Sequence, residues 1–191
     1  MNGVKAIGLR TWLVAAVLAG AALSPASGAP EATPGVGGLA PEFSLKSIEG
    51  QPLTLSQLRD RFVVIHFAAT WCPFCNAELP HLIALDKAYK EKGVQVLIVD
   101  VKERKSTVER MARKFGVGFP VLLDEDGSVA KRFAPPKSVQ PDLGRDEVMV
   151  ASNLVIDKEG RIRFFSLLDT ARFDAKLIAL RTVLDGLLEG R

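Results

Sequence analysis

The feature that most constrains this chain is a pair of cysteines, Cys72 and Cys75, placed two residues apart. The apolar run 63–67 lies just before them and predicts a buried strand, and the pattern that follows them predicts a helix. A Cys-x-x-Cys at a strand-to-helix junction is typical of a reactive dithiol. The first thiol then meets the unpaired N–H groups and the positive end of the helix dipole, which stabilise a thiolate. The pair therefore predicts thiol–disulfide exchange.

A structural disulfide is the plain alternative for the same two cysteines, which are the only ones among 191 residues. A ring closed over two intervening residues removes little entropy from the unfolded chain, so it would stabilise the fold poorly. The spacing therefore favours chemistry over a structural role.

The N-terminal segment has the pattern of an export signal. Lys5 and Arg10 precede an apolar run, 12–23, and small residues follow at 26–29. This pattern predicts a signal peptide over 1–28, cleaved between Gly28 and Ala29. An uncleaved membrane anchor is the alternative, although the run is short for a full span. The Pro- and Gly-rich stretch 29–39 is interpreted as a flexible linker, and 40–191 as one domain.

Composition supports a globular domain and argues against nucleic-acid binding. Hydrophobic residues make up 48% of the chain and charged residues 25%. Removal of 1–28 takes away two positive charges and no acidic residue, so the formal net charge falls from +3 to +1. A nearly neutral domain offers no electrostatic attraction to nucleic acid.

Hydrophobic periodicity predicts strands that alternate with helices, and therefore a mainly parallel sheet. Helices are expected from 72 to 93, from 106 to 115 with Ser106 as its cap, and at the C-terminus with Leu177, Leu180, Leu184, Leu187 and Leu188 on its apolar side. Further strands are expected at 94–99 and 120–123, and hairpins over 40–55 and 150–165. A Pro-rich loop is expected over 134–144.

The run Phe67 to Pro80 resembles the active-site segment of exported thioredoxin-fold proteins of the TlpA/ResA type, within the redoxin or AhpC-TSA-like superfamily. The chain shares their Ala-Pro-x-Phe-x-Leu start at 40–45, the Ala-Thr-Trp-Cys-x-x-Cys motif at 69–75 and the Asp157 to Gly160 hairpin turn. The resemblance covers about residues 40–190. It implies an α/β thioredoxin-like fold with a central mixed sheet flanked by helices, an N-terminal β-hairpin and an inserted strand–helix unit.

The position of each cysteine assigns it a role in such an exchange. Cys72, at the helix start and expected to be the more exposed, would attack, and Cys75 would resolve the mixed disulfide. Glu78 follows Cys75 on the same helical face and is predicted to be a partly buried acid with a raised pKa that moves a proton to or from the resolving thiol. An exposed helix glutamate is the alternative for Glu78.

Neighbouring residues are expected to form the substrate site. Trp71 is predicted to cover the dithiol, with ordinary aromatic core as its alternative, and Pro73 and Phe74 are predicted to tune the reduction potential.

The chain departs from the family at Ala151, where the resemblance implies a cis-proline facing the dithiol. A cis bond before alanine is costly, so Val150–Ala151 is predicted to be trans. Val150 and Ala151 are nevertheless included in the predicted substrate site. Pro120 is a rival for the cis position, one strand earlier.

Three other functions remain as alternatives. A copper site would combine the cysteines with a histidine, but His66 is expected to pack as a satisfied core residue and His81 to be exposed, so no metal is predicted. A thiol peroxidase would need a proline and a threonine where Ile65 and Ala69 stand. A non-catalytic binding module is the third alternative, and no cofactor is predicted.

The resemblance implies a periplasmic reductase of protein disulfides, with cytochrome c or copper-site assembly as possible settings. Because the periplasm is held oxidising, such a reductase would need a membrane thiol electron donor to return it to the reduced form.

Overall fold

The computed structural model describes residue 1 and residues 35–135 and 143–190. The predicted signal peptide, its cleavage site, the first part of the linker and most of the Pro-rich loop fall outside these residues. Within the described part of the chain, no helix is both long enough and apolar enough to cross a membrane.

A seven-stranded sheet forms the centre of the domain, in the order β2-β1-β5-β4-β3-β6-β7. Its strands are β1 (Ser44–Ser47), β2 (Pro52–Thr54), β3 (Phe62–Ala68), β4 (Val94–Val101), β5 (Val121–Asp124), β6 (Ser152–Ile156) and β7 (Ile162–Ser166). The central strands β3 and β6 are buried along their whole length, as expected for strands covered on both faces. Both predicted hairpins are confirmed, as β1–β2 and β6–β7.

The prediction of a mainly parallel sheet is wrong. Parallel pairing is limited to β3 with β4 and β4 with β5, and the other four pairings are antiparallel. The connections explain the difference. Helices occupy the connections after β3 and β4 and allow parallel crossovers, whereas the short turns at 48–51 and 157–161 bring their strands back antiparallel. The result is the mixed sheet implied by the family resemblance.

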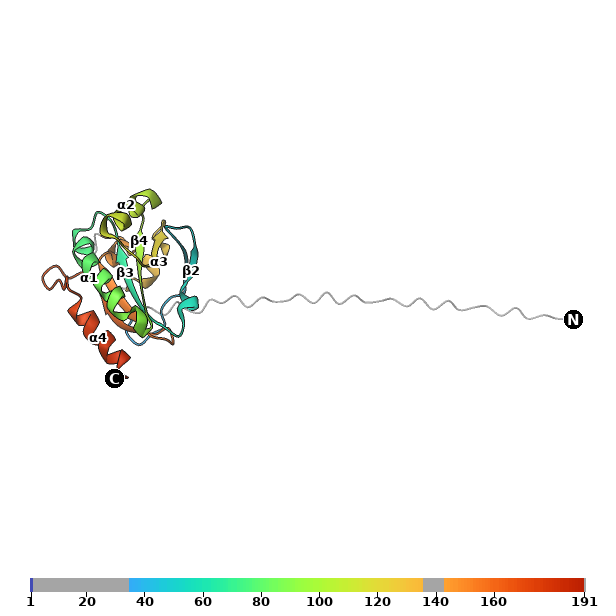
Figure 1. Ribbon diagram of the computed structural model, residues 1–191. Helices are drawn as coiled ribbons and strands as arrows, with labels where there is room; N and C mark the ends of the chain where they lie inside the picture. The colour runs from blue at the N-terminus through green and yellow to red at the C-terminus, as the bar shows by residue number, and fades with distance from the viewer. Residues whose placement is uncertain (2–34, 136–142, 191) are drawn as a thin grey trace. The chain divides into compact units, whose positions relative to one another are not determined.

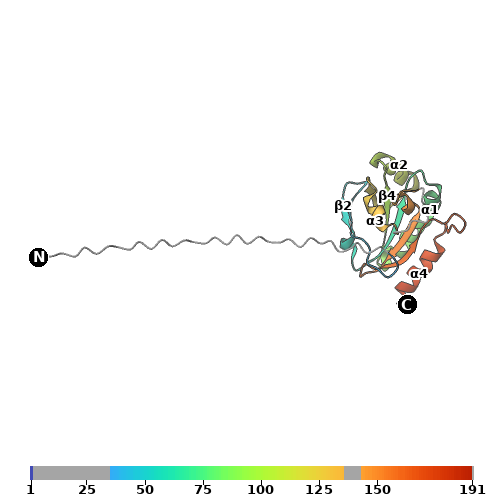
Figure 2. The same ribbon diagram turned by 180° about the vertical axis from the view of Figure 1, so that it is seen from behind.

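Within residues 35–135 and 143–190, four α-helices flank the sheet: α1 (Pro73–Tyr89), α2 (Lys105–Phe115), α3 (Ser128–Phe133) and α4 (Ile178–Leu188). Helices α1 and α4 lie on one side of the sheet and α3 on the other (Figures 1 and 2). The predicted cap at Ser106 is wrong, because α2 begins one residue earlier and Arg104 occupies the cap position. The six residues of α3 were not expected, since so short a segment carries no clear periodicity.

Helix α1 positions the cysteine pair against the end of β3. Its buried face carries Leu79, Leu82 and Leu85, which pack into the core, and the last turns end at Gly93 in the left-handed conformation. The side chain of Cys72 caps the other end of the helix. The packing of α1 against the core therefore holds its N-terminus, and with it the cysteine pair, in place.

The described end of the expected linker is attached to the sheet. The Gly37 N–H donates to the Ile162 carbonyl, the Ala40 N–H donates to the Gly160 carbonyl, and Leu39 forms a bridge with Arg161. Ordered backbone contacts thus begin a few residues before the domain start expected at residue 40.

Candidate active site

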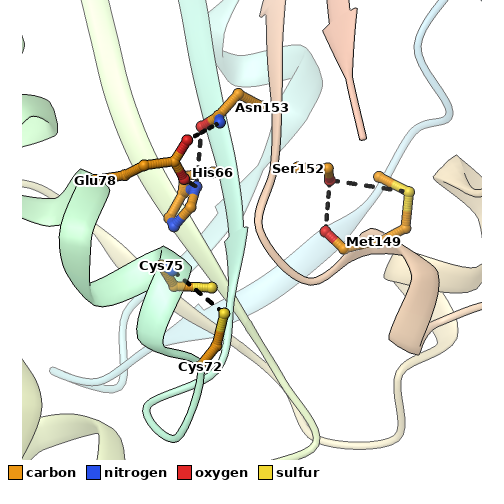
Figure 3. A network of polar contacts seen from close by, with 7 residues as sticks. All are labelled: His66, Cys72, Cys75, Glu78, Met149, Ser152 and Asn153. Atoms are coloured by element: carbon orange, nitrogen blue, oxygen red, sulfur yellow. Dashed lines mark hydrogen bonds and ion pairs between the residues drawn. The ribbon is translucent and has the colours of Figure 1, made fainter. Parts of the chain in front are cut away.

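The two cysteines lie at the first turn of α1, with their sulfur atoms turned toward each other (Figure 3). Both are free thiols. Cys72 is the cap residue, and the Cys75 backbone N–H donates to its sulfur at 3.2 Å. Pro73 occupies the first helical turn, where its missing N–H leaves no bond unmade. The strand-to-helix geometry expected for a reactive dithiol is therefore present.

The environment separates the proton affinities of the two thiols. The Cys75 side chain lowers the pKa of Cys72 from 9.0 to about 6 by hydrogen bonding to its thiolate, and the backbone N–H groups of Cys75 and Phe74 add to this against the opposing effect of burial. The same contact with Cys72 raises the pKa of Cys75, and burial raises it further. One thiol thus ionises readily while the other holds its proton.

The expectation that Cys72 is the more exposed cysteine is wrong, since each residue is only 3% exposed. The two cysteines differ instead in whether they line a groove beside the helix start. Cys72 lines a groove of about 750 Å³, and Cys75 does not. Segments far along the chain form the groove with the helix start, with Leu143, Val148, Leu167 and Leu168 among the residues that line it.

The groove brings together most of the predicted substrate site. Trp71, Pro73, Phe74 and Val150 line it beside Cys72. Trp71 is 68% exposed, so it lies at the surface beside the dithiol and is not part of the aromatic core. Phe74 packs edge-on against Phe173, with ring centroids 4.9 Å apart. The residues that line the groove next to Cys72 are thus largely apolar.

Ala151 lies outside this groove and lines a second cavity of about 300 Å³ together with Glu78, Asn153 and Asp174. None of the described peptide bonds is cis, so Val150–Ala151 is trans as predicted, and so is the bond before Pro120. Ala151 adopts a φ of 65°, a region that residues other than glycine seldom occupy. Its N–H donates to the Phe67 carbonyl at 2.8 Å, which extends the pairing of β3 with β6.

Glu78 is buried, at 3% exposure, and its pKa is raised to about 8. Burial is the largest cause, opposed by a hydrogen bond from Asn153, and the nearby charges of Cys72 and Asp174 raise the pKa further. The Asn153 side-chain N–H donates to Glu78 Oε1 at 2.9 Å. The raised pKa and burial expected for this acid are both present, and the exposed alternative is excluded.

His66 is also part of this cluster, although the sequence indicated only a satisfied core residue. Its Nδ1 lies 2.9 Å from Asn153 Oδ1 and 3.5 Å from Glu78 Oε2, whereas its Nε2 is buried with no hydrogen-bond partner among the described residues. The register explains the meeting, because His66 on β3 stands directly opposite Asn153 on β6. His81, expected to be exposed, is half-buried.

A second acidic cluster, not anticipated from the sequence, holds the loop before Cys72. Glu103 accepts hydrogen bonds from the Thr70 N–H and, at 2.7 Å, from the Thr70 hydroxyl. The Asn76 side chain donates to the Thr70 carbonyl at 3.0 Å. Asp100, on β4 opposite Ala68, is buried, and neither of its carboxyl oxygens meets the distance and angle limits of a hydrogen bond within the described residues. Burial raises its pKa to about 8, with further increases from the charge of Glu103 and from contact with its side chain.

Metal ligands do not gather in the part of the chain that the structure describes. No group of three or more His, Cys, Asp or Glu side chains there is arranged to hold an ion.

Comparisons with known proteins agree with this geometry. The model of the AhpC/TSA family matches residues 36–165. The thiol-disulfide oxidoreductase ResA of Geobacillus kaustophilus (strain HTA426) is 34% identical over 128 residues, which is 67% of each chain. The ResA of Geobacillus thermodenitrificans (strain NG80-2) is 33% identical over the same length.

Solved structures share the fold at lower identity. A putative protein disulfide isomerase from Bacteroides thetaiotaomicron superposes with a TM-score of 0.69 at 23% identity, over 82% of this chain and 91% of the other. A putative thiol:disulfide interchange protein DsbE from Chlorobium tepidum gives 0.66 at 22% identity, over 82% and 99%. The thioredoxin-like α/β fold implied by the sequence resemblance is confirmed.

Proposed function

This chain belongs to the AhpC/TSA family and is a thiol–disulfide oxidoreductase, and from this premise we propose that it reduces protein disulfides with the Cys72–Cys75 dithiol. The observation that carries the proposal is the opposite shift of the two thiol pKa values, downward to about 6 for Cys72 and upward for Cys75. Such a pair contains one ready nucleophile and one thiol that keeps its proton until it is needed.

In the first step the Cys72 thiolate attacks one sulfur of a substrate disulfide. A bond forms between Cys72 and that sulfur, the substrate S–S bond breaks, and one substrate thiolate leaves. In the second step Cys75 gives up its proton and attacks Cys72 Sγ, which forms the Cys72–Cys75 disulfide and releases the second substrate thiolate. The substrate gains two electrons, and the dithiol is oxidised by two.

Glu78 is the base that this second step needs. Cys75 and Glu78 lie three residues apart on one face of α1, and the charge of Glu78 acts on the Cys75 thiol. A carboxyl with a pKa of about 8 exchanges a proton readily near neutral pH, because it is poised between its two forms there. Glu78 therefore takes the Cys75 proton as the mixed disulfide is resolved.

The groove supports a protein as the substrate. Its lining is mainly apolar, with Trp71 exposed at its edge and Leu167 and Leu168 across from it. Arg172, which also lines the groove, is paired with Asp169 at 2.8 Å and so is not left to attract the carboxylates of a small charged thiol. An apolar floor of this size suits a polypeptide segment around the target disulfide.

We propose the reductive direction from the resemblance to exported proteins of the TlpA/ResA type. The lowered pKa of Cys72 supplies the thiolate that attacks a substrate disulfide. We place the protein in the periplasm on the strength of its N-terminal pattern. A membrane thiol donor would then reduce the Cys72–Cys75 disulfide by the reverse exchange.

A thiol peroxidase fits less well. Ile65 is a buried strand residue and Ala69 is also buried, so neither supplies a hydroxyl near Cys72. Thr70, two residues before Cys72, has its hydroxyl bound to Glu103. Consumption of hydrogen peroxide at a catalytic rate, with dithiothreitol as reductant, would overturn the proposal in favour of this function.

The roles of the cysteines are tested with 5,5′-dithiobis(2-nitrobenzoate), which forms a mixed disulfide and releases coloured thionitrobenzoate (TNB). The reduced protein should release two equivalents of TNB in two phases, the second independent of protein concentration. Cys75→Ala should release one equivalent and remain a mixed disulfide, and Cys72→Ala should lose the fast phase. Full release by Cys75→Ala would contradict the resolving role.

A further inference from the structure

The carboxyl of Glu78 is held in a chain of three buried side chains from three different elements. His66 lies on β3, Asn153 on β6 and Glu78 on α1 (Figure 3). His66 is completely buried, and Glu78 and Asn153 are each 3% exposed. In Figure 3 the imidazole extends from the Glu78–Asn153 pair toward the start of α1, where Cys75 lies. These three side chains thus lie on the side of the site where the resolving thiol, Cys75, is found.

With the Asn153 amide in this orientation, each hydrogen bond has one direction. Asn153 Nδ2 can only donate, and it lies 2.9 Å from Glu78 Oε1. Asn153 Oδ1 can only accept, so His66 Nδ1, at 2.9 Å, must carry the proton that is shared with it. Burial lowers the pKa of His66 to about 4 against the opposing hydrogen bonds of Asn153 and the Ser152 backbone, so the ring is neutral and carries a single N–H. The contact with Asn153 Oδ1 assigns that N–H to Nδ1. The two bonds run in series from His66 through Asn153 to Glu78.

The orientation of the Asn153 amide decides how Glu78 holds a proton. With Nδ2 facing Oε1, the amide donates to the carboxylate and stabilises its charged form. With the amide turned over, Oδ1 would face Glu78 and favour the protonated form. Asn153 alone has no preference between the two, but a His66 Nδ1–H can donate to Asn153 only when Oδ1 faces His66, as in the first orientation. Through Asn153, His66 on β3 therefore affects how readily Glu78 on α1 takes up a proton.

We propose that His66 is a positioning residue for Glu78: its Nδ1–H locks the Asn153 side chain in the orientation that keeps Glu78 able to accept the Cys75 proton. This inference rests on the proposed role of Glu78 in the exchange. Oε2 is the oxygen that receives the proton, since Asn153 occupies Oε1, whereas Oε2 makes no hydrogen bond within the described residues and has His66 Nδ1 3.5 Å away. His66 itself transfers no proton in this scheme.

Other charges act on Glu78 and must stay constant in a test. Cys72 and Cys75 face it from the start of α1, and Asp174 faces it from the segment before α4. Asp174 and Cys72 both raise the Glu78 pKa. In the mixed disulfide Cys72 carries no charge, so Glu78 should then titrate at or below about 8. None of these groups is altered by a change at His66.

The experiment follows the second release of TNB, the step in which Cys75 attacks Cys72, from about pH 5 to 9. In the wild type the rate should rise with pH and reach half its maximum at or below about pH 8. His66→Leu removes the Nδ1–H donor, and the midpoint should move upward by about one pH unit, so that release well below the midpoint is about tenfold slower. His66→Asn restores a side-chain N–H donor and should return the midpoint to that of the wild type.

Ser152→Ala is the matched control. Ser152 adjoins Asn153 on β6 and is equally buried, but its side chain points to the other face, where the hydroxyl donates to the Met149 carbonyl (Figure 3). The control therefore loses a buried hydrogen bond on the same strand without touching Glu78. Its midpoint should equal that of the wild type, whatever it loses in stability.

Two results separate failure of this inference from failure of the proposed function. If Glu78→Gln abolishes the pH dependence while His66→Leu leaves the midpoint unchanged, His66 is packing alone and the inference is overturned. If Glu78→Gln leaves the profile unchanged, Glu78 is not the base, and this inference falls together with the proposed role of Glu78. The exchange by Cys72 and Cys75 is then judged by the TNB release of the cysteine variants alone.

Two further measurements test the inference if His66→Leu does not fold. Asn153→Leu removes the donor to Glu78 from the other end of the chain and should also move the midpoint upward. In the wild type, the ¹⁵N chemical shifts of the His66 ring at neutral pH should show a neutral ring with its proton on Nδ1. A proton on Nε2 instead would contradict the inference directly.

Discussion

Replacing Cys75 by alanine removes the contact that contributes most to the low pKa of Cys72. The fall from 9.0 to about 6 corresponds to about 4 kcal/mol in favour of the thiolate. A hydrogen bond to a charged group contributes about 1.5–3 kcal/mol, so its loss should raise the Cys72 pKa by about one to two units. The backbone N–H groups of Phe74 and residue 75 remain in place and should hold it below 9.0.

The assay is the absorbance of the thiolate at 240 nm as the pH is raised, checked by the rate of alkylation with iodoacetamide. Cys75→Ser is the matched control, because its hydroxyl still donates to the Cys72 sulfur while the second thiol is gone. The alanine variant should titrate well above the wild type, and the serine variant should stay near it. An alanine variant that still titrates near pH 6 would refute the reasoning and assign the low pKa to the helix N-terminus alone.

The remaining predictions concern stability, measured by urea unfolding. Ala151→Gly should stabilise the fold by about 0.5–1 kcal/mol, because glycine adopts the φ of 65° without the strain that a Cβ atom causes. Ala151→Pro should destabilise it by about 3 kcal/mol or more, because proline cannot adopt this φ and lacks the N–H that donates to the Phe67 carbonyl. A proline variant more stable than the glycine variant would show that the position is unstrained. Asp100 has a pKa of about 8 when folded and near 3.8 when unfolded, so the folded state holds a proton that the unfolded state releases, and wild-type stability should fall as the pH rises from about 4 to about 8. Asp100→Asn should lack that loss and gain a few kcal/mol over the wild type across this range, whereas parallel stability profiles would contradict the raised pKa.

The elements near the dithiol were predictable from sequence because their signals are local. The apolar run before Cys72, the proline at the first helical turn and the periodic leucines after it all act within one strand–helix unit. The burial of Glu78 followed from its helical spacing to Cys75. These inferences needed no knowledge of distant segments.

The rest of the site depends on residues far apart in the sequence. His66 and Asn153 are 87 residues apart and meet only through the register of β3 with β6. Glu103 reaches Thr70 across 33 residues, from the end of β4. The groove beside Cys72 likewise includes Leu143, Val150 and Leu167, which are more than 70 residues away in the sequence. No local pattern encodes these meetings, which is why the sequence indicated a satisfied histidine and an exposed cysteine.

The reduction potential of the Cys72–Cys75 couple, measured by equilibration with dithiothreitol or glutathione buffers, decides whether the protein reduces disulfides. We expect a reversible two-electron couple near the value of thioredoxin, about −270 mV, as suits a reductase supplied by a thiol donor. A value near that of DsbA, about −120 mV, would reverse the direction to disulfide formation. The absence of any reversible couple would contradict thiol–disulfide exchange itself and leave only a binding role for the fold.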